Sequence, residues 1–312
     1  MVAAAFFRSN VQAALALQED CLRYIELEGG LSGLAVRTKI SVPTGGAIRK
    51  DTLADVAGLV PLFEQVAAQL GGRFKVPVTL GFPSRDILIR VIELPEMDLD
   101  DAREALKWDF EKHFPYAYGD AAVDIARVET PSPSPGTMAL LVASCRLRAV
   151  ETVMRVADAV GMGLKAIEPL NVALFRGITG PLPAFEKGHL VLFSREGVTQ
   201  IILGYGENGI LYRSSLLDFK REENGVVEYS AFVREVINTL TFIRKEYRGL
   251  DVETFLLAGA LAQETALAEL LTAGTGLTCI AANPWNAWGL PLPEDEESGW
   301  ETVMGLAVRD IS

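Results

Sequence analysis

Three short apolar runs near the start of the chain decide its fold: VQAALAL (residues 11–17), CLRYIEL (residues 21–27) and GLAVRTKIS (residues 33–41). Charged or glycine-containing turns, such as Glu28-Gly29-Gly30, separate them. Apolar runs of strand length that are bounded by turn residues predict consecutive β-strands. The opening of the chain therefore predicts a three-stranded meander at the start of a sheet.

A second series of the same kind begins about 180 residues later. Its three runs are Leu190–Phe193, Val198–Gly204 and Ile210–Leu216. Each meander is followed by apolar residues at helical spacing, which predict helices over residues 53–70 and 227–247. Strands are predicted after these helices, over residues 76–82 and 254–258. This recurrence indicates an internal duplication and an α/β protein of two lobes.

A segment of different character interrupts the first lobe. Strands are predicted over residues 87–94, 121–129 and 138–144, and helices from Asp98 to His113 and from Leu147 to Val160. Together they form a β-α-β-β-α module over residues 85–161. The predicted organisation is a first lobe of residues 1–84 and 162–184, this inserted module, and a second lobe of residues 185–312. The Gly180–Pro183 stretch is the expected hinge.

The composition excludes several classes of function. A net charge of −12 makes nucleic acid an unexpected partner, because the surface should repel phosphate backbones. No apolar stretch approaches the roughly 18 residues of a membrane-spanning helix, so no span is expected. Cys21, Cys145 and Cys279 are far apart and lie in apolar runs, which indicates free thiols in a reducing compartment. No spacing suits a metal site, so none is expected.

Six segments, in the correct order, carry a resemblance to a known family. They are VPVTLGFP (76–83), IRVIELP (89–95), the acidic helix ending at Phe114-Pro115-Tyr116, LVAS (141–144), residues 159–169, and MGLAVR (304–309). With the two meanders and the inserted module, the chain resembles the PilM family of type IV pilus assembly proteins, which are related to the cell-division protein FtsA. The resemblance implies a two-lobed actin-like fold, with ribonuclease H-like subdomains and the module inserted in the first lobe.

The resemblance also implies a function and a location. The chain is expected to be a cytoplasmic scaffold at the inner face of the inner membrane, part of the platform that assembles type IV pili. It implies that the N-terminal tail of a PilN-like membrane protein binds as an extended segment between the first lobe and the module. Other platform components and the assembly ATPase are further possible partners.

The residues expected to bind the tail lie on the first strand of the module and the adjoining loops. They are Phe82, Arg90, Ile92, Leu94 and Pro95, with Phe114 and Tyr116 across from them. Arg90 is expected to pair with an acidic or carbonyl group of the tail. For the apolar members a place in the core of the module is an equally open interpretation.

The first phosphate-binding turn of the family departs from its pattern here. The family has aspartate-x-glycine followed by small hydroxyl residues and a lysine, because phosphates need close backbone approach and a metal needs the carboxylate. This chain has Ala16 and Gln18 at the aspartate and glycine positions, and Glu19 and Asp20 in the turn. Arg23, at the lysine position, is the retained cation.

The other two turns are also incomplete. Arg195 stands where the second phosphate turn needs a small residue, although Thr199 fits. The adenosine-side turn keeps Gly259 but has Ala258 before it. The resemblance therefore implies a degenerate nucleotide site, with neither tight binding of ATP and Mg²⁺ nor hydrolysis expected, and no other cofactor.

Two alternatives remain open. One is the cytosolic part of an L-type component of a type II secretion system, and the other is an active actin-like ATPase. No catalytic residues are predicted. His113 continues an apolar helical stripe and is expected in a core or a cap, and His189 is expected to be exposed at the start of a strand.

Overall fold

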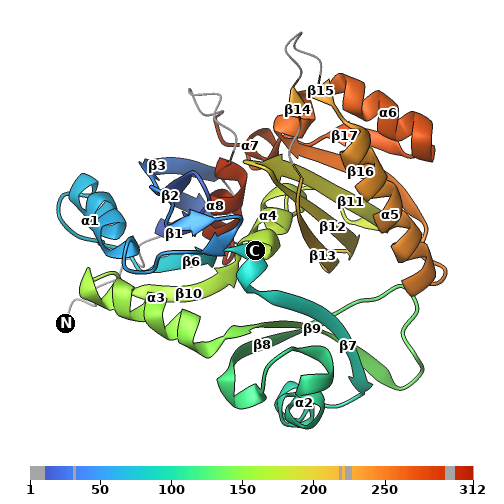
Figure 1. Ribbon diagram of the computed structural model, residues 1–312, viewed down its shortest axis with the longest axis horizontal. Helices are drawn as coiled ribbons and strands as arrows, with labels where there is room; N and C mark the ends of the chain where they lie inside the picture. Colours follow the sequence, from blue (N-terminus) through green and yellow to red (C-terminus); the bar gives the residue numbers. More distant parts are fainter. Residues whose placement is uncertain (1–10, 31–32, 218–219, 222–226, 292–298, 312) are drawn as a thin grey trace, which may run out of the picture.

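The computed structural model describes residues 11–30, 33–217, 220–221, 227–291 and 299–311. Its two lobes are built on five-stranded sheets, and a smaller three-stranded sheet lies below them (Figure 1).

The two large sheets have the same strand order. In the first lobe β1 (Val11–Leu17), β2 (Cys21–Gly30) and β3 (Gly33–Pro43) form the antiparallel meander, and β6 (Val78–Phe82) and β10 (Leu164–Pro169) extend it in parallel, in the order β10-β6-β1-β2-β3. In the second lobe β11 (Phe185–Arg195), β12 (Val198–Gly206), β13 (Asn208–Leu216), β16 (Val252–Gly259) and β17 (Thr278–Ala281) follow the order β13-β12-β11-β16-β17. The duplication seen in the sequence is therefore a duplication of topology.

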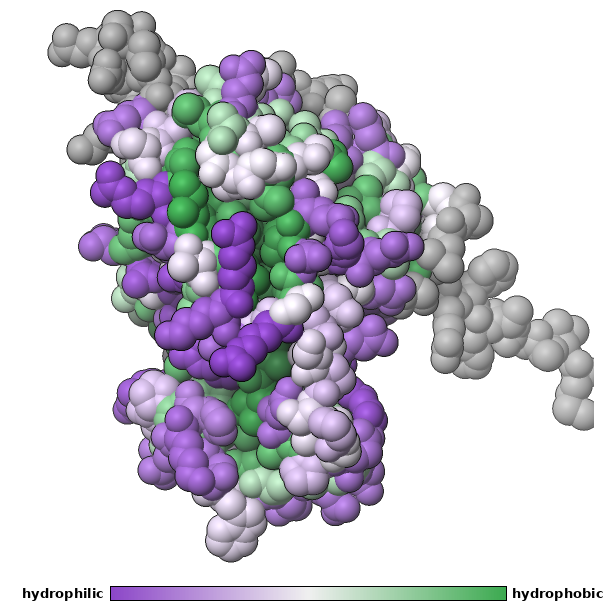
Figure 2. All heavy atoms as spheres, turned by 90° about the vertical axis from the view of Figure 1, so that its right-hand side faces the viewer, coloured by the Kyte–Doolittle hydropathy of each residue, from purple (hydrophilic) through white to green (hydrophobic). Residues whose placement is uncertain are grey.

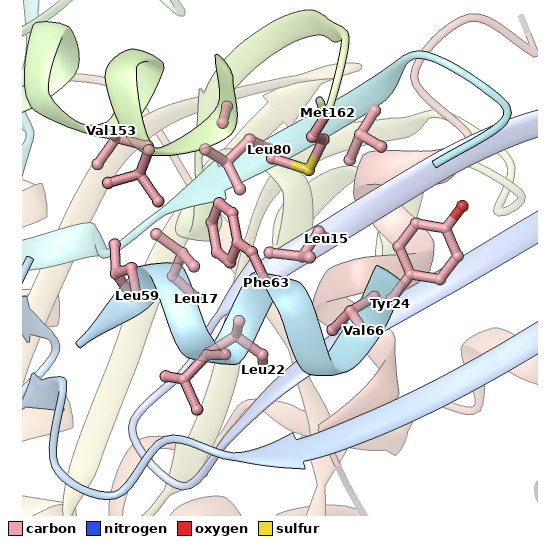
Figure 3. Close-up of a cluster of buried hydrophobic side chains, with 14 of the residues drawn as sticks. Leu15, Leu17, Leu22, Tyr24, Leu59, Phe63, Val66, Leu80, Val153 and Met162 are labelled. Carbon is pink, nitrogen blue, oxygen red and sulfur yellow. The ribbon is translucent and has the colours of Figure 1, made fainter. Parts of the chain in front are cut away.

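The first-lobe core lies between its sheet and two helices, α1 (Leu59–Gln69) and α3 (Leu147–Ala159). Figure 3 shows Phe63 of α1 and Val153 of α3 directed toward Leu15 and Leu80 of the sheet. The helix predicted over residues 53–70 begins later, at Leu59, because short strands β4 (Ile48–Arg49) and β5 (Thr52–Leu53) form a hairpin before it.

The inserted module is a three-stranded sheet covered on one face by a helix. Its elements are β7 (Leu88–Pro95), α2 (Leu99–His113), β8 (Ala121–Val128) and β9 (Thr137–Arg146), with strand order β7-β9-β8. The predicted last helix of the module, α3, packs its apolar face into the first-lobe core instead. Asp98 caps α2 by accepting a hydrogen bond from the Asp101 amide at 2.8 Å. His113 is exposed in the last turn of α2, so of its two expected positions the core is wrong and the helix end is the one it occupies.

The second lobe carries its helices on the outer face of the sheet. These are α5 (Ser230–Glu246) and α6 (Thr265–Thr275), which follows the 3₁₀ turn η3 (Ala260–Gln263). The remaining short elements of the chain are η1 (Ser84–Asp86), η2 (Tyr118–Asp120), β14 (Lys220–Arg221), β15 (Val227–Glu228) and α7 (Pro284–Ala287). In Figure 2 the module forms a separate lower body, and hydrophilic side chains lie across the waist above it.

Two helices lie between the lobes, and each packs on the sheet of the other repeat, while the first also contacts strands of its own repeat. The helix α4 (Leu170–Thr179) ends the first repeat, yet Leu174, Phe175 and Ile178 pack on the second-lobe sheet. The helix α8 (Trp300–Ala307) ends the second repeat and packs on β1 and β2 of the first (Figure 1). Residues 300–307, which were assigned to the second lobe, thus pack on the sheet of the first.

Candidate functional site

Loops from the two lobes meet across the cleft at Asp20. Asp20 lies in the turn between β1 and β2, and Arg195 ends β11 in the other lobe. The Nη2 atom of Arg195 donates to Oδ2 of Asp20 at 2.5 Å. Arg23 donates its Nη1 and Nη2 atoms to the same carboxylate at 3.0 and 2.8 Å. One carboxylate is therefore shared by two arginines, one from each lobe.

The surroundings keep Asp20 ionised. Burial raises the pKa of its carboxyl, but the hydrogen bonds and positive charges of Arg23 and Arg195 outweigh burial and hold the pKa far below its usual range. The Arg23 side chain is only 1% exposed, so this ion-pair group is largely withdrawn from water. Truncating one member of such a group leaves buried charge behind.

The other two residues predicted for the nucleotide site lie beside this group. Ser194 pairs with Thr199 on one side and with Gly259 on the other. Thr199 is fully buried, and its hydroxyl donates to Ser194 Oγ at 3.2 Å. Gly259 has a φ of +62°, and a Cβ there would lie 2.7 Å from the Phe193 ring. Arg23, Thr199 and Gly259 thus lie close to one another beside the cleft, and both the positive φ and the nearby Phe193 ring require the glycine.

A second contact between the lobes is made by Asp51 at the tip of the β4–β5 hairpin. Its carboxylate accepts hydrogen bonds from the Ser84 amide and from Gln200 Nε2 of the second lobe, both at 3.1 Å. Burial raises the pKa of Asp51 to about 6. The cavity left between these groups measures ≈ 50 Å³, well below the roughly 300–1,000 Å³ of ordinary ligand pockets.

A larger groove of ≈ 330 Å³ separates the module from the first lobe. One wall is the module sheet, through five successive residues of β8, 122–126, and through Leu141 and Ala143 of β9. The opposite wall is formed by β10 and α4, including Ile167 and Val172. Since neighbouring residues of a strand point to opposite faces, five successive lining residues mean that β8 presents its backbone edge to the groove.

Both strands that border the groove have an unpaired edge. Among the described strands, β8 pairs only with β9, and β10 pairs only with β6. An unpaired edge offers a row of backbone donors and acceptors to an added strand. The groove therefore has the geometry that receives an extended peptide.

Two arginines stand at one end of this groove. Arg176 donates to Glu168 Oε2 at 3.1 Å and to the Gly305 carbonyl at 3.0 Å. The side chain of Arg309 is exposed, and it makes no salt bridge or side-chain hydrogen bond with any residue that the structure describes. Its charge is thus available to a ligand carboxylate.

The seven residues predicted to bind a partner do not form one surface. Phe82 is fully buried in the first-lobe core, and Ile92 and Phe114 are buried in the core of the module. Leu94 and Tyr116 pack against that same core, and the Tyr116 hydroxyl donates to Ser144 Oγ at 3.1 Å. Arg90 and Pro95 are exposed on β7. Among the described residues that line the groove, none of the seven is present.

The residues that do line the groove were missed for a clear reason. Ala122, Ala126 and Ala143 are small residues within ordinary strand patterns, and nothing local distinguishes them. Arg309 lies in the predicted terminal motif, but its position beside the module depends on the exchange of α8 between lobes. The strand predicted over residues 89–95, which ends in a proline, has a clear apolar pattern. That pattern marks residues in the core of the module and not residues of a binding surface.

Comparisons with known proteins agree with this architecture. No protein-family model matches the chain, and no curated protein matches it. Among solved structures, a PilM–PilN type IV pilus biogenesis complex is similar with a TM-score of 0.78 and 21% identity, covering 97% of this chain and 99% of that one. A Bacteroides thetaiotaomicron protein with an actin-like ATPase fold and unknown function has a TM-score of 0.51 and 13% identity, covering 92% and 98%. The cytoplasmic domain of Vibrio cholerae EpsL, from a type II secretion system, has a TM-score of 0.49 and 11% identity, covering 78% and 81%.

These likenesses define an actin-like protein with a PilM-like arrangement of its lobes and module. In the part of the chain that is described, no helix is long and apolar enough to cross a membrane.

Proposed function

We propose that this chain is a cytoplasmic scaffold of the inner-membrane platform that assembles type IV pili, and that it binds the N-terminal tail of a PilN-like membrane protein. The similar solved complex contains a PilN partner. The protein would then stay at the cytoplasmic face of the membrane through that partner, and other platform components would attach elsewhere on its surface.

One observation carries the proposal: the groove between the module and the first lobe. It offers the β8 edge, an apolar wall and an arginine at one end. An extended tail would add main-chain hydrogen bonds to β8 and place alternate side chains against Leu141 and Val172. The proposed binding surface is this groove, and Arg90 on β7 is outside it.

Nucleotide has no part in the proposed function. The direct contact between Asp20 and Arg195 and the ≈ 50 Å³ cavity support this, because the turns that hold phosphates in actin-like proteins are joined here by the protein's own side chains. A scaffold that binds a tail without a nucleotide cycle is the function that fits this cleft.

The test is calorimetric titration with a synthetic peptide covering the N-terminal cytoplasmic tail of a PilN-like membrane protein from the same organism. We expect saturable one-to-one binding. The Ala126→Trp substitution fills the groove from an exposed position on β8 and should weaken binding at least about tenfold, or about 1.4 kcal/mol. If the peptide binds elsewhere and does not contact β8, its affinity should be the same for Ala126→Trp and for the wild type.

Two controls locate the surface. Ala231→Trp, at an exposed position on α5 of the second lobe, makes the same change far from the groove and should leave the affinity unchanged. Arg90→Ala should also leave the affinity unchanged. If binding is lost in Arg90→Ala and retained in Ala126→Trp, the binding site lies on β7 and not in the groove. No binding by a folded wild-type protein would remove the proposal.

A further inference from the structure

A second pocket lies behind the hinge between the lobes. It measures ≈ 580 Å³. Its lining includes Leu34 from the first lobe, Leu182 and Ala184 between α4 and β11, Phe185 at the start of β11, and Trp288 after α7. Apart from the exposed Ala184, these are half-buried hydrophobic side chains. The pocket has an ordinary size for a ligand site and an apolar wall.

This hinge pocket and the module groove are neighbours. Arg176 and Arg309 line both of them. At the far end of β8 the module also approaches the hinge pocket, since a Cβ on Gly206, which lines the pocket, would lie 3.4 Å from Oε2 of Glu129. The module groove and the hinge pocket are therefore adjacent, and Arg176 and Arg309 lie where they meet.

The junction holds two arginines, and carboxylates lie near them. Arg176 is paired with Glu168, so its charge is already balanced. Asp310, the neighbour of Arg309, is paired with Lys165 at 2.5 Å. Arg309 is left as the cation that faces both hollows. A carboxylate placed here gains a charge-assisted hydrogen bond, while the apolar walls on either side favour hydrophobic side chains.

We propose that the hinge pocket is a second anchor for the same partner tail, which passes the module groove, sets a carboxylate on Arg309 and places an apolar side chain beside Trp288. This inference rests on the proposed function and extends it. It defines the partner chemistry as an extended segment with two apolar stretches and one acidic residue between them. A tail that is bound at one site holds its second segment close to the second site. The second contact is then intramolecular, so it raises the affinity of the whole tail.

The experiment compares three peptides on the full chain: the complete N-terminal tail of a PilN-like protein from the same organism, its N-terminal half and its C-terminal half. We expect the complete peptide to bind at least about tenfold tighter than the better half. Ala184→Trp, which fills the hinge pocket from an exposed position, should reduce the affinity for the complete peptide to that of the half that occupies the module groove, and should leave the affinity for that half unchanged. Arg309→Ala should weaken the complete peptide about tenfold.

Each outcome separates the two proposals. If a half peptide binds as tightly as the complete tail, and neither Ala184→Trp nor Arg309→Ala changes this, the hinge pocket is no anchor and the groove alone remains. If neither the complete tail nor either half binds to the folded protein, the scaffold proposal and its extension both fail. Because both substituted side chains are exposed, and Ala231→Trp serves again as the matched control, a folding defect would be recognised as such.

Discussion

His189 is a single residue whose environment reverses its expected role. Its place at the start of a predicted strand suggested exposure, but the side chain is 1% exposed. It stacks between Phe185 and Phe175, with ring centroids 4.1 and 5.8 Å away. The strand β11 begins earlier than the apolar run, at Phe185, which places His189 inside the sheet. Burial lowers the pKa of His189 to about 4.

This shift predicts a pH dependence of stability. Between the ordinary histidine pKa of about 6.5 and the native value of about 4, the unfolded chain binds a proton that the native chain does not. The stabilisation is therefore complete above pH ~6.5 and is lost as the pH falls toward 4, by up to about 3 kcal/mol. His189→Leu should remove this part of the slope, measured by urea unfolding at several pH values.

The comparison with a variant is needed because Asp51 acts in the opposite direction. Its pKa is raised to about 6, so the native chain binds its proton first and gains stability as the pH falls. Only the difference between wild type and His189→Leu isolates the histidine. His113→Leu, at an exposed position on α2, is the matched control. Equal slopes for wild type and His189→Leu would show that His189 is not held neutral.

At the scale of elements, the crossing of α4 and α8 joins the two repeats. The helices approach through Gly177 and Gly305, so their backbones are in contact. A Cβ on Gly305 would lie 1.9 Å from the Ala173 carbonyl oxygen. The close approach of α4 and α8 thus depends on glycine at both positions.

Gly305→Ala should separate these helices and destabilise the protein. The nearest atoms are backbone and cannot rotate away, so we expect a loss of about 1–3 kcal/mol or more in denaturant unfolding. Gly274→Ala is the matched control, since that helical glycine on α6 is exposed and only the Ile237 Cδ1 atom lies as near as 4.0 Å. It should stabilise by about 0.5–1 kcal/mol. A loss of similar size in both variants would contradict the close crossing.

The elements also show where sequence-based prediction ends. Both meanders, the Asp98 helix and the module strands follow local apolar patterns, and the structure has them within a few residues. The packing of α4 and α8 across the lobes leaves no local pattern, because an apolar helix face does not itself specify which sheet it will cover. The groove escaped prediction for the same reason: its walls come from β8, β10 and α4, and their apposition is set by tertiary packing.

At the scale of the whole molecule, charged side chains join the two lobes where an actin-like cleft would be open. Asp20 connects them through Arg195, and Asp51 connects them through Gln200. The module touches both lobes as well, because Val91 packs against the second-lobe core and Ser132 Oγ donates to the Arg248 carbonyl at 3.1 Å. The relative position of the lobes is thus fixed by internal contacts.

Asp20→Ala tests the contribution of the shared carboxylate. The substitution removes a partly buried carboxylate that accepts hydrogen bonds from Arg23 and Arg195, so we expect a loss of about 1–3 kcal/mol or more in chemical unfolding. Asp124→Ala removes a carboxylate that is 79% exposed and paired with Arg103 on the surface. That pair should contribute at most about 1 kcal/mol. A small loss in Asp20→Ala would mean that solvent already screens the cleft.

The same contacts predict that the wild-type protein does not respond to nucleotide. A ligand present at a hundred times its dissociation constant adds about 2.7 kcal/mol to a two-state fold, which a melting curve detects readily. We expect the melting temperature to be unchanged by Mg-ATP, because the Asp20 carboxylate already lies between the two arginines that could meet a phosphate. In Asp20→Ala those arginines lack that carboxylate, so inorganic phosphate should stabilise the variant more than the wild type. A clear rise of the wild-type melting temperature with Mg-ATP would mean that the cleft opens, and would restore the actin-like ATPase as the better description of this chain.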